Sequence, residues 1–164
     1  MSRKSLYVIF AVLGAIIALL VIAKLRYSGK APVKLSAESC NAELWKHVYE
    51  AERLKVIEPC TAVEGRVVSL HPASDGDLHI RLDPERKSVL NLINVMHANG
   101  ALVVELICHH TPTDSNVKAS CGDFHYEVMV PKVGDRVRVI GAYVTDRGNG
   151  WNEIHPVTRI EALR

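Results

Sequence analysis

A chain of 164 residues can hold one domain and an appendage. Its formal net charge is +2, but five of its 20 basic residues precede residue 31 and all of its 18 acidic residues follow it. The remainder is therefore slightly acidic, and the chain has only two Trp and two Phe. This composition argues against an electrostatic interface for single-stranded nucleic acid. Nucleic-acid binding is therefore a less favoured alternative.

An apolar segment without charged residues occupies positions 5–23. As a helix it is about 28 Å long, close to the ~30 Å hydrocarbon core of a bilayer, and a helix satisfies its own backbone groups in lipid. The sequence predicts a transmembrane anchor within residues 1–27 that contacts the lipid bilayer through residues 5–23. A cleaved signal peptide is the alternative, but the length of the segment and the charges of Lys24 and Arg26 after it favour an uncleaved anchor.

Flanking charge does not orient this anchor, because basic residues lie on both sides of it. The cysteines are more informative: all four follow the apolar segment, and none forms a C-x-x-C pair that would indicate a zinc ribbon or a thioredoxin-type site. Two disulfides in an oxidising compartment are the simpler interpretation, which predicts a single-pass protein of the cell membrane with an extracytoplasmic soluble domain. Three pairings are possible, and the sequence-local one joins Cys40 to Cys60 and Cys108 to Cys121.

After a linker at residues 28–38, the soluble domain is expected to span residues 39–164. Residues 39–53 have a helical pattern, with Leu44, Val48 and Ala51 on one face. The pattern then changes to that of a strand over residues 61–70, where Gly65 indicates a bulge or a close backbone contact.

The middle of the domain alternates strands with one further helix. Residues 74–77 are a turn signal, and residues 77–83 alternate apolar and polar side chains as a half-buried strand does. Pro84 can begin a helix that ends before Gly100. The nearly all-apolar residues 101–108 then predict a central strand.

The C-terminal part predicts a polar loop followed by three more strands. The loop covers residues 109–121, a short strand is expected at 124–130, and two long strands at 134–145 and 151–160 flank a hairpin turn at 146–150. About five principal strands with Gly-rich bends favour a small barrel.

Residues 130–141 resemble the beginning of a strand common in OB-fold domains. With this resemblance, the expected fold class is mainly β with one or two helices, a small OB-like β-barrel behind an N-terminal transmembrane helix. The helix departs from the usual pattern, because an OB-fold places it between the third and fourth strands and this sequence predicts it between the second and third. A different small barrel therefore remains open.

Four further blocks are informative: residues 53–57, 75–79, 100–105 and 150–157. They resemble an uncharacterised family of prokaryotic secreted or membrane-tethered OB-like domains. The resemblance covers most of the chain after Cys40 and implies fold and location, but no activity.

Two strands carry a histidine and a carboxylate two residues apart, which places each pair on one side of its strand. These pairs are Asp77 with His79 and Glu153 with His155. If the two faces meet, the four side chains could bind Zn²⁺ or a similar cation, and an open metal site could hydrolyse a substrate. The favoured alternative is that they are ordinary polar residues on an outer face.

Two further candidates are weaker. A zinc site built from Cys108, Cys121 and the histidines at 109, 110 and 125 requires reduced thiols, which a disulfide would exclude. Tyr126, Tyr143 and Trp151 could form a ligand-stacking platform, although Trp151 as a hydrophobic plug is favoured.

These observations predict a non-enzymatic, membrane-anchored binding domain of the cell envelope, with a protein, a glycan or a small molecule as its partner. The alternative is a metal-dependent hydrolase that uses Asp77, His79, Glu153 and His155. No cofactor is expected apart from a divalent metal such as zinc at that polar site.

Overall fold

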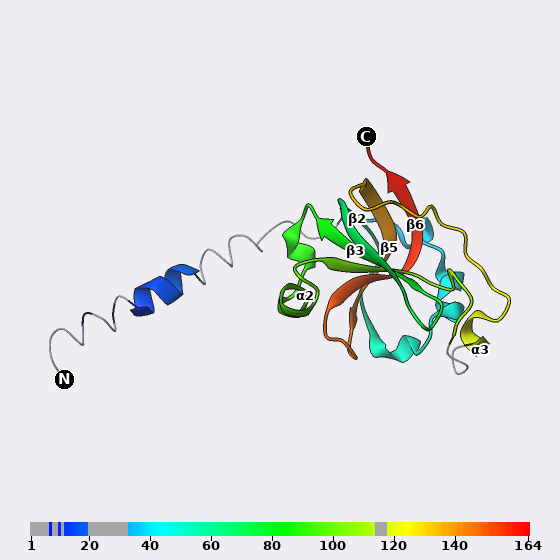
Figure 1. Ribbon diagram of the computed structural model, residues 1–164, viewed down its shortest axis with the longest axis horizontal. Helices are drawn as coiled ribbons and strands as arrows, with labels where there is room; N and C mark the ends of the chain where they lie inside the picture. Colours follow the sequence, from blue (N-terminus) through cyan, green and yellow to red (C-terminus); the bar gives the residue numbers. More distant parts are fainter. Residues whose placement is uncertain (1–6, 8–9, 11, 20–32, 114–117) are drawn as a thin grey trace.

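The computed structural model describes residues 7, 10, 12–19, 33–113 and 118–164. Six strands form the body of the domain, and short helical segments lie around it (Figure 1). The strands are β1 (Val33–Lys34), β2 (Leu54–Pro72), β3 (Leu78–Pro84), β4 (Leu102–Leu106), β5 (Arg136–Asp146) and β6 (Asn152–Ala162). The 3₁₀ helices are η1 (Ala37–Ser39), η2 (Ala42–His47), η3 (Ala51–Arg53) and η4 (Lys87–Val89), and the α-helices are α2 (Leu92–His97) and α3 (Lys118–Cys121).

The sheet closes on itself as a ring. Its order is β1-β2-β3-β4-β6-β5, and a further pairing of β2 with β5 joins the two ends. The β4–β6 pair is parallel, and all other pairs are antiparallel. The mainly β fold expected from the sequence is thus confirmed.

Two glycines permit the bends that closure requires. Gly65 pairs with Pro84 of β3 and with Val137 of β5, so β2 passes from one neighbour to the other at this point. A Cβ at residue 65 would lie 2.5 Å from the Asp83 carbonyl oxygen, which confirms the close backbone contact expected there. Gly141 on β5 is equally restricted, because its Cβ would lie 2.5 Å from the Pro156 carbonyl oxygen.

The described residues form two hydrophobic clusters, one on each side of β5. Val137, Val139 and Tyr143 face the first cluster, inside the ring, whereas Ala142 and Val144 face the second. This second cluster also contains Leu44 and Val48 from the N-terminal region, Ile107 after β4, and the Cys108 and Cys121 side chains. From Val139 to Val144 the strand is buried on both faces, which explains the continuous apolar sequence of this stretch.

The helix predicted over residues 39–53 is wrong. Three short 3₁₀ helices replace it, and η2 ends at His47 because the backbone of the next residue, Val48, is extended. Glu50 has a left-handed backbone with φ of 49°, which a continuous α-helix cannot contain. The apolar pattern nevertheless identified buried residues, because Leu44 and Val48 pack in the second cluster.

Two other expected elements also differ. The helix predicted at 84–99 is reduced to η4 and α2, because residues 78–84 continue as strand and Asn91 caps the helix only at Leu92. Residues 124–130 form no strand, since Phe124 and Tyr126 instead pack against the second cluster. The strands predicted at 61–70, 77–83, 101–108, 134–145 and 151–160 are confirmed, although β2 begins earlier, at Leu54.

Both disulfides follow the sequence-local pairing. Cys40 is bonded to Cys60 and Cys108 to Cys121, and no cysteine is free. The first bond ties η1 to β2, and the second joins the end of β4 to α3. The predicted pairing is therefore confirmed.

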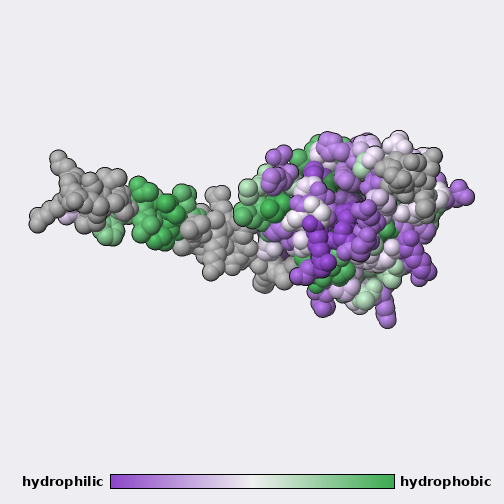
Figure 2. Space-filling model, turned by 90° about the horizontal axis from the view of Figure 1, so that it is seen from below, coloured by the Kyte–Doolittle hydropathy of each residue, from purple (hydrophilic) through white to green (hydrophobic). Residues whose placement is uncertain are grey.

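The predicted membrane segment lies partly outside the described residues. Of positions 5–23, only 7, 10 and 12–19 are described; they are helical, and the apolar stretch is visible in Figure 2. Within the described ranges, no helix has both the length and the apolar composition needed to cross a membrane.

Candidate functional site: a buried polar cluster around Glu105

Neighbouring strands bring the two predicted histidine–carboxylate pairs together on the face of the sheet opposite the first hydrophobic cluster. His79 of β3 is paired in register with Glu105 of β4. On the other side of β4, Val103 is paired with Glu153 of β6. Because side chains two residues apart share a face, Glu105 stands between His79 on one side and Glu153 with His155 on the other.

His155 lies at the centre of this cluster and is completely buried. Its Nδ1 makes a hydrogen bond of 3.1 Å with Glu153 Oε1. The same nitrogen is 2.7 Å from Glu105 Oε2, an ion-pair contact without hydrogen-bond geometry. The imidazole is therefore held between two carboxyl groups, both of which are also buried.

Asp77 reaches the cluster from the turn before β3. This turn is closed by a hydrogen bond from the Asp77 amide to Asp75 Oδ1. Asp77 Oδ1 accepts a 2.8 Å hydrogen bond from the Cys108 amide, and Asp77 Oδ2 lies 3.9 Å from His155 Nε2. The disulfide-bonded Cys108 thus fixes the orientation of the carboxyl group.

Basic side chains line the cluster where it approaches the surface. Arg53 of η3 binds Asp146 and lies 4.0 Å from Glu105 Oε2. The Arg81 guanidinium stacks over the Trp151 ring at 4.8 Å, and the Trp151 indole donates a 2.8 Å hydrogen bond to Glu153 Oε2. The charge of the buried carboxyl groups is therefore partly balanced by Arg53 and Arg81, which lie between the cluster and the solvent.

Burial and charge shift the pKa values within the cluster in different directions. Burial would lower the pKa of His155, but the carboxylates of Glu105 and Glu153 outweigh this effect and raise it to about 10. Burial would raise the pKa of Glu105, but the adjacent His155 cation keeps it well below its ordinary range. Burial raises the pKa of Asp77 to about 7, and burial together with Glu105 raises that of Glu153.

Four polar atoms of this region have no hydrogen-bond partner among the described residues. They are His79 Nε2, Arg81 Nη1, Glu105 Oε2 and His155 Nε2. Buried polar atoms are nearly always hydrogen-bonded in folded proteins. Their concentration at one place makes this cluster a candidate binding site.

The other predicted sites do not assemble. The Cys108–Cys121 disulfide removes the thiolates that a zinc site with His109, His110 or His125 would need. Of the proposed stacking residues, Tyr143 is buried in the first cluster, where its hydroxyl donates to the Val89 carbonyl oxygen at 2.7 Å. Tyr126 packs against the second cluster, and Trp151 lies under Arg81.

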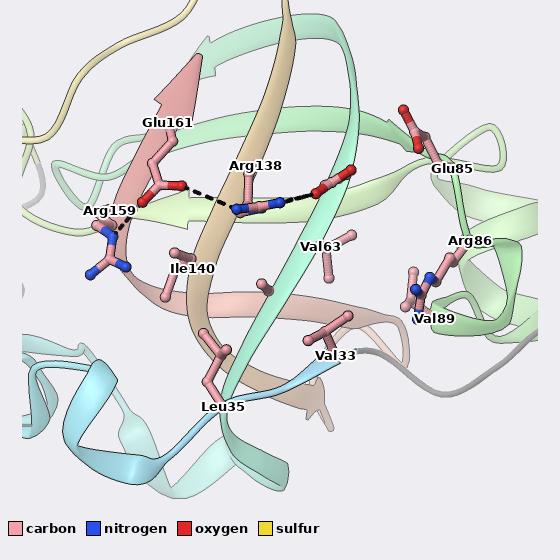
Figure 3. A pocket seen from close by; sticks show the side chains of 12 residues that line it. Val33, Leu35, Val63, Glu85, Arg86, Val89, Arg138, Ile140, Arg159 and Glu161 are labelled. Carbon is pink, nitrogen blue, oxygen red and sulfur yellow. Dashed lines mark hydrogen bonds and ion pairs between the residues drawn. The ribbon is translucent and has the colours of Figure 1, made fainter. Parts of the chain in front are cut away.

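A separate hollow of about 360 Å³ lies beside β1 (Figure 3). Its floor is apolar and includes Leu35 and Ile140. On its wall, Arg138 pairs with Glu64 at 2.5 Å and with Glu161 at 3.7 Å. The hollow thus combines apolar surface with charged groups that already neutralise one another.

The sequence predicted four members of the cluster, Asp77, His79, Glu153 and His155, but missed Glu105. Glu105 is the single charged residue in the apolar segment 101–108, and a lone carboxyl group in a central strand was the available signal. Arg53 and Arg81 were missed because their contacts depend on the closure of the ring. The sequence matches no protein-family model, and no curated protein is significantly similar to it.

Proposed function

We propose that this protein is a membrane-anchored binding module of the cell envelope, with an OB-like barrel as its soluble, extracytoplasmic part. It takes a small amphipathic ligand, or the corresponding part of a glycan or an envelope protein, in the hollow beside β1. The observation that carries the proposal is the composition of this hollow, an apolar floor below an Arg–Glu network.

The order of the ring supports an OB-like barrel. When β2 to β6 are counted as the first to fifth strands, their order around the ring is one, two, three, five, four and back to one. The third and fifth strands are parallel, and the first and fourth close the ring. This is a five-stranded Greek-key arrangement, and α3 lies between the third and fourth strands, where an OB-fold has its helix.

The cysteines and the N-terminal segment support the location. Two disulfides and no free thiol fit an oxidising compartment. The described helical residues 12–19 carry apolar side chains that are exposed, among them Leu13 and Ile17. Such a surface favours an apolar environment, as the proposed anchor in residues 5–23 would have.

The hollow beside β1 supports ligand binding by its size and chemistry. Sites for small molecules usually measure about 300–1,000 Å³ and combine apolar walls with a few polar groups. At its wall, Arg138 donates two hydrogen bonds to Glu64. A ligand could replace one of these bonds, either with an acceptor group that binds the guanidinium or with a donor group that binds the carboxylate. An apolar body with a polar or charged end fits this lining best.

The test uses the full-length chain in detergent and a library of small amphipathic compounds, detected by NMR of the Val, Leu and Ile methyl groups. We expect binding compounds to shift the resonances of Val33, Leu35 and Ile140. Leu35→Trp should fill the hollow and abolish these shifts, whereas the control Val56→Trp, at an exposed position of β2, should preserve them. Compounds whose shifts survive Leu35→Trp would contradict the proposal.

A further inference from the structure

We propose that Asp77, Glu105 and His155 form a binding site for one divalent transition-metal ion such as Zn²⁺. One ligand atom from each of these three side chains lies within 4.8 Å of the others, and all three residues are buried. The site is distinct from the hollow beside β1, with which it shares no lining residue.

The orientation of His155 is the first argument. Its Nδ1 is hydrogen-bonded to Glu153 Oε1, which leaves Nε2 as the nitrogen that can bind a metal. Nε2 is completely buried and has no hydrogen-bond partner among the described residues. Metal-binding histidines typically have one nitrogen on a carboxylate and the other on the metal, and His155 offers this arrangement when its Nε2 proton is released to solvent as the metal binds.

The distance between His155 and Asp77 is the second argument. His155 Nε2 and Asp77 Oδ2 are 3.9 Å apart, which is too far for a hydrogen bond. Two ligands of a tetrahedral zinc ion, each about 2.1 Å from the metal, are separated by roughly 3.4 Å. A shift of a few tenths of an ångström would therefore let both atoms bind one ion, while Asp77 Oδ1 keeps its bond to the Cys108 amide.

Glu105 supplies the third ligand. Its Oε2 is buried and has no hydrogen bond in the described part of the chain; it lies 2.7 Å from His155 Nδ1 and would exchange this contact for the metal, while Glu153 keeps Nδ1. Rotation of the carboxyl group can direct one oxygen to the ion and keep the other near His79, whose Nε2 lies 3.5 Å from Glu105 Oε1. Arg53, 4.0 Å from Oε2, bounds the site on that side.

The donor set determines the class of metal. One imidazole and two carboxylates suit zinc and other first-row divalent ions, whereas an imidazole is a poor ligand for Ca²⁺ or Mg²⁺. The neighbouring grouping of Asp77 with Cys108 and Cys121 is different, because its sulfur atoms are joined in a disulfide and provide no thiolate. A metal bound at His155 thus has nitrogen and oxygen ligands only.

Glu153 is a positioning residue for this site. It holds His155 Nδ1 and in turn accepts the hydrogen bond of the Trp151 indole. Loss of such a supporting carboxylate typically weakens metal binding about 10- to 100-fold and leaves the ligands in place. Glu153→Gln should therefore reduce zinc affinity by this factor and preserve the stoichiometry.

The test is zinc binding to the full-length chain in detergent, after treatment with chelator and re-equilibration with Zn²⁺, with the metal content measured by mass spectrometry. We expect about one zinc ion per chain, and binding at least 100-fold weaker for Asp77→Asn and His155→Gln. The controls Asp123→Asn and His125→Gln, at exposed positions outside the cluster, should bind zinc as the wild type does.

Asp77→Asn is the decisive variant if His155→Gln fails to fold, because an Asn side chain can still accept the Cys108 amide. Cobalt supplies a measurement that needs no variant: Co²⁺ in the wild-type site should give visible ligand-field bands without thiolate charge-transfer absorption. Absence of stoichiometric metal from the wild type, or unchanged affinity in folded Asp77→Asn, would overturn the proposal.

Discussion

Glu105 Oε2 and His155 Nδ1 lie 2.7 Å apart in the interior, on two strands that are neighbours and parallel. Between the end of β4 at Leu106 and the beginning of β6 at Asn152 lie 45 residues, so no local sequence pattern links Glu105 to His155. Their contact exists only because the ring places β6 beside β4. The charged centre of the protein is thus a product of its topology.

The disulfides should stabilise the domain more than its surface ion pairs do. Replacing Cys40 and Cys60 together by Ala should lower the free energy of unfolding by about 2–4 kcal/mol, because the bond restricts the unfolded chain. Denaturant unfolding of the wild type and the variant measures this difference. Glu43→Gln, which removes an exposed pair with Lys46, is the control and should change it by less than about 1 kcal/mol. Mass spectrometry of alkylated, unreduced protein that found four free thiols would refute the account of these bonds.

Two glycines should tolerate no side chain. Gly65→Ala and Gly141→Ala each place a Cβ 2.5 Å from a carbonyl oxygen of the neighbouring strand, so backbone atoms must move. Each substitution should lower the free energy of unfolding by about 1–3 kcal/mol. Gly148→Ala is the matched control, because its Cβ would meet only the Asp146 side chain, at 3.2 Å. Equal stabilities of all three variants would show that the bends of β2 and β5 are placed incorrectly.

Tyr143 should give the protein a specific dependence on alkaline pH. Burial raises the pKa of its hydroxyl from the ordinary value of about 10 to about 12. Because the folded-state pKa is the higher one, the stabilising contribution is complete below pH 10 and is lost as the pH rises toward 12. A spectrophotometric titration should reveal one late-ionising tyrosine that is missing in folded Tyr143→Phe. If the Tyr143→Phe titration kept that late phase, Tyr143 would not be its source.

The strands and the two predicted polar pairs could be found from the sequence because both follow the two-residue period. Asp77 with His79 and Glu153 with His155 were placed on common faces by this rule alone. Glu105 could not be assigned to the same cluster, since its partners depend on which strands are neighbours. The 3₁₀ region was misjudged for a different reason: Leu44 and Val48 are apolar at helical spacing, but the left-handed Glu50 interrupts the helix.

The N-terminal segment should retain the protein in membranes. Leu13→Arg with Ile17→Arg places two charges in the proposed span, at a cost of about 2.5–3.5 kcal/mol each at the centre of a bilayer. Extraction of membranes with alkaline carbonate should release this variant and leave the wild type in the pellet. Val133→Arg, at an exposed position of the domain, should remain with the membranes. Release of the wild type would exclude an uncleaved anchor.

The most direct test of the account is a double-mutant cycle between Glu105 and His155, measured by denaturant unfolding in the presence of chelator. Each of Glu105→Gln and His155→Gln leaves a buried polar or charged group without its partner, at a cost of roughly 3–5 kcal/mol. If the two side chains form an ion pair, the double variant should lose less unfolding free energy than the two single variants lose together, by about 1 kcal/mol or more. Additive effects, within about 0.5 kcal/mol, would contradict a charged Glu105–His155 contact at the centre of the protein.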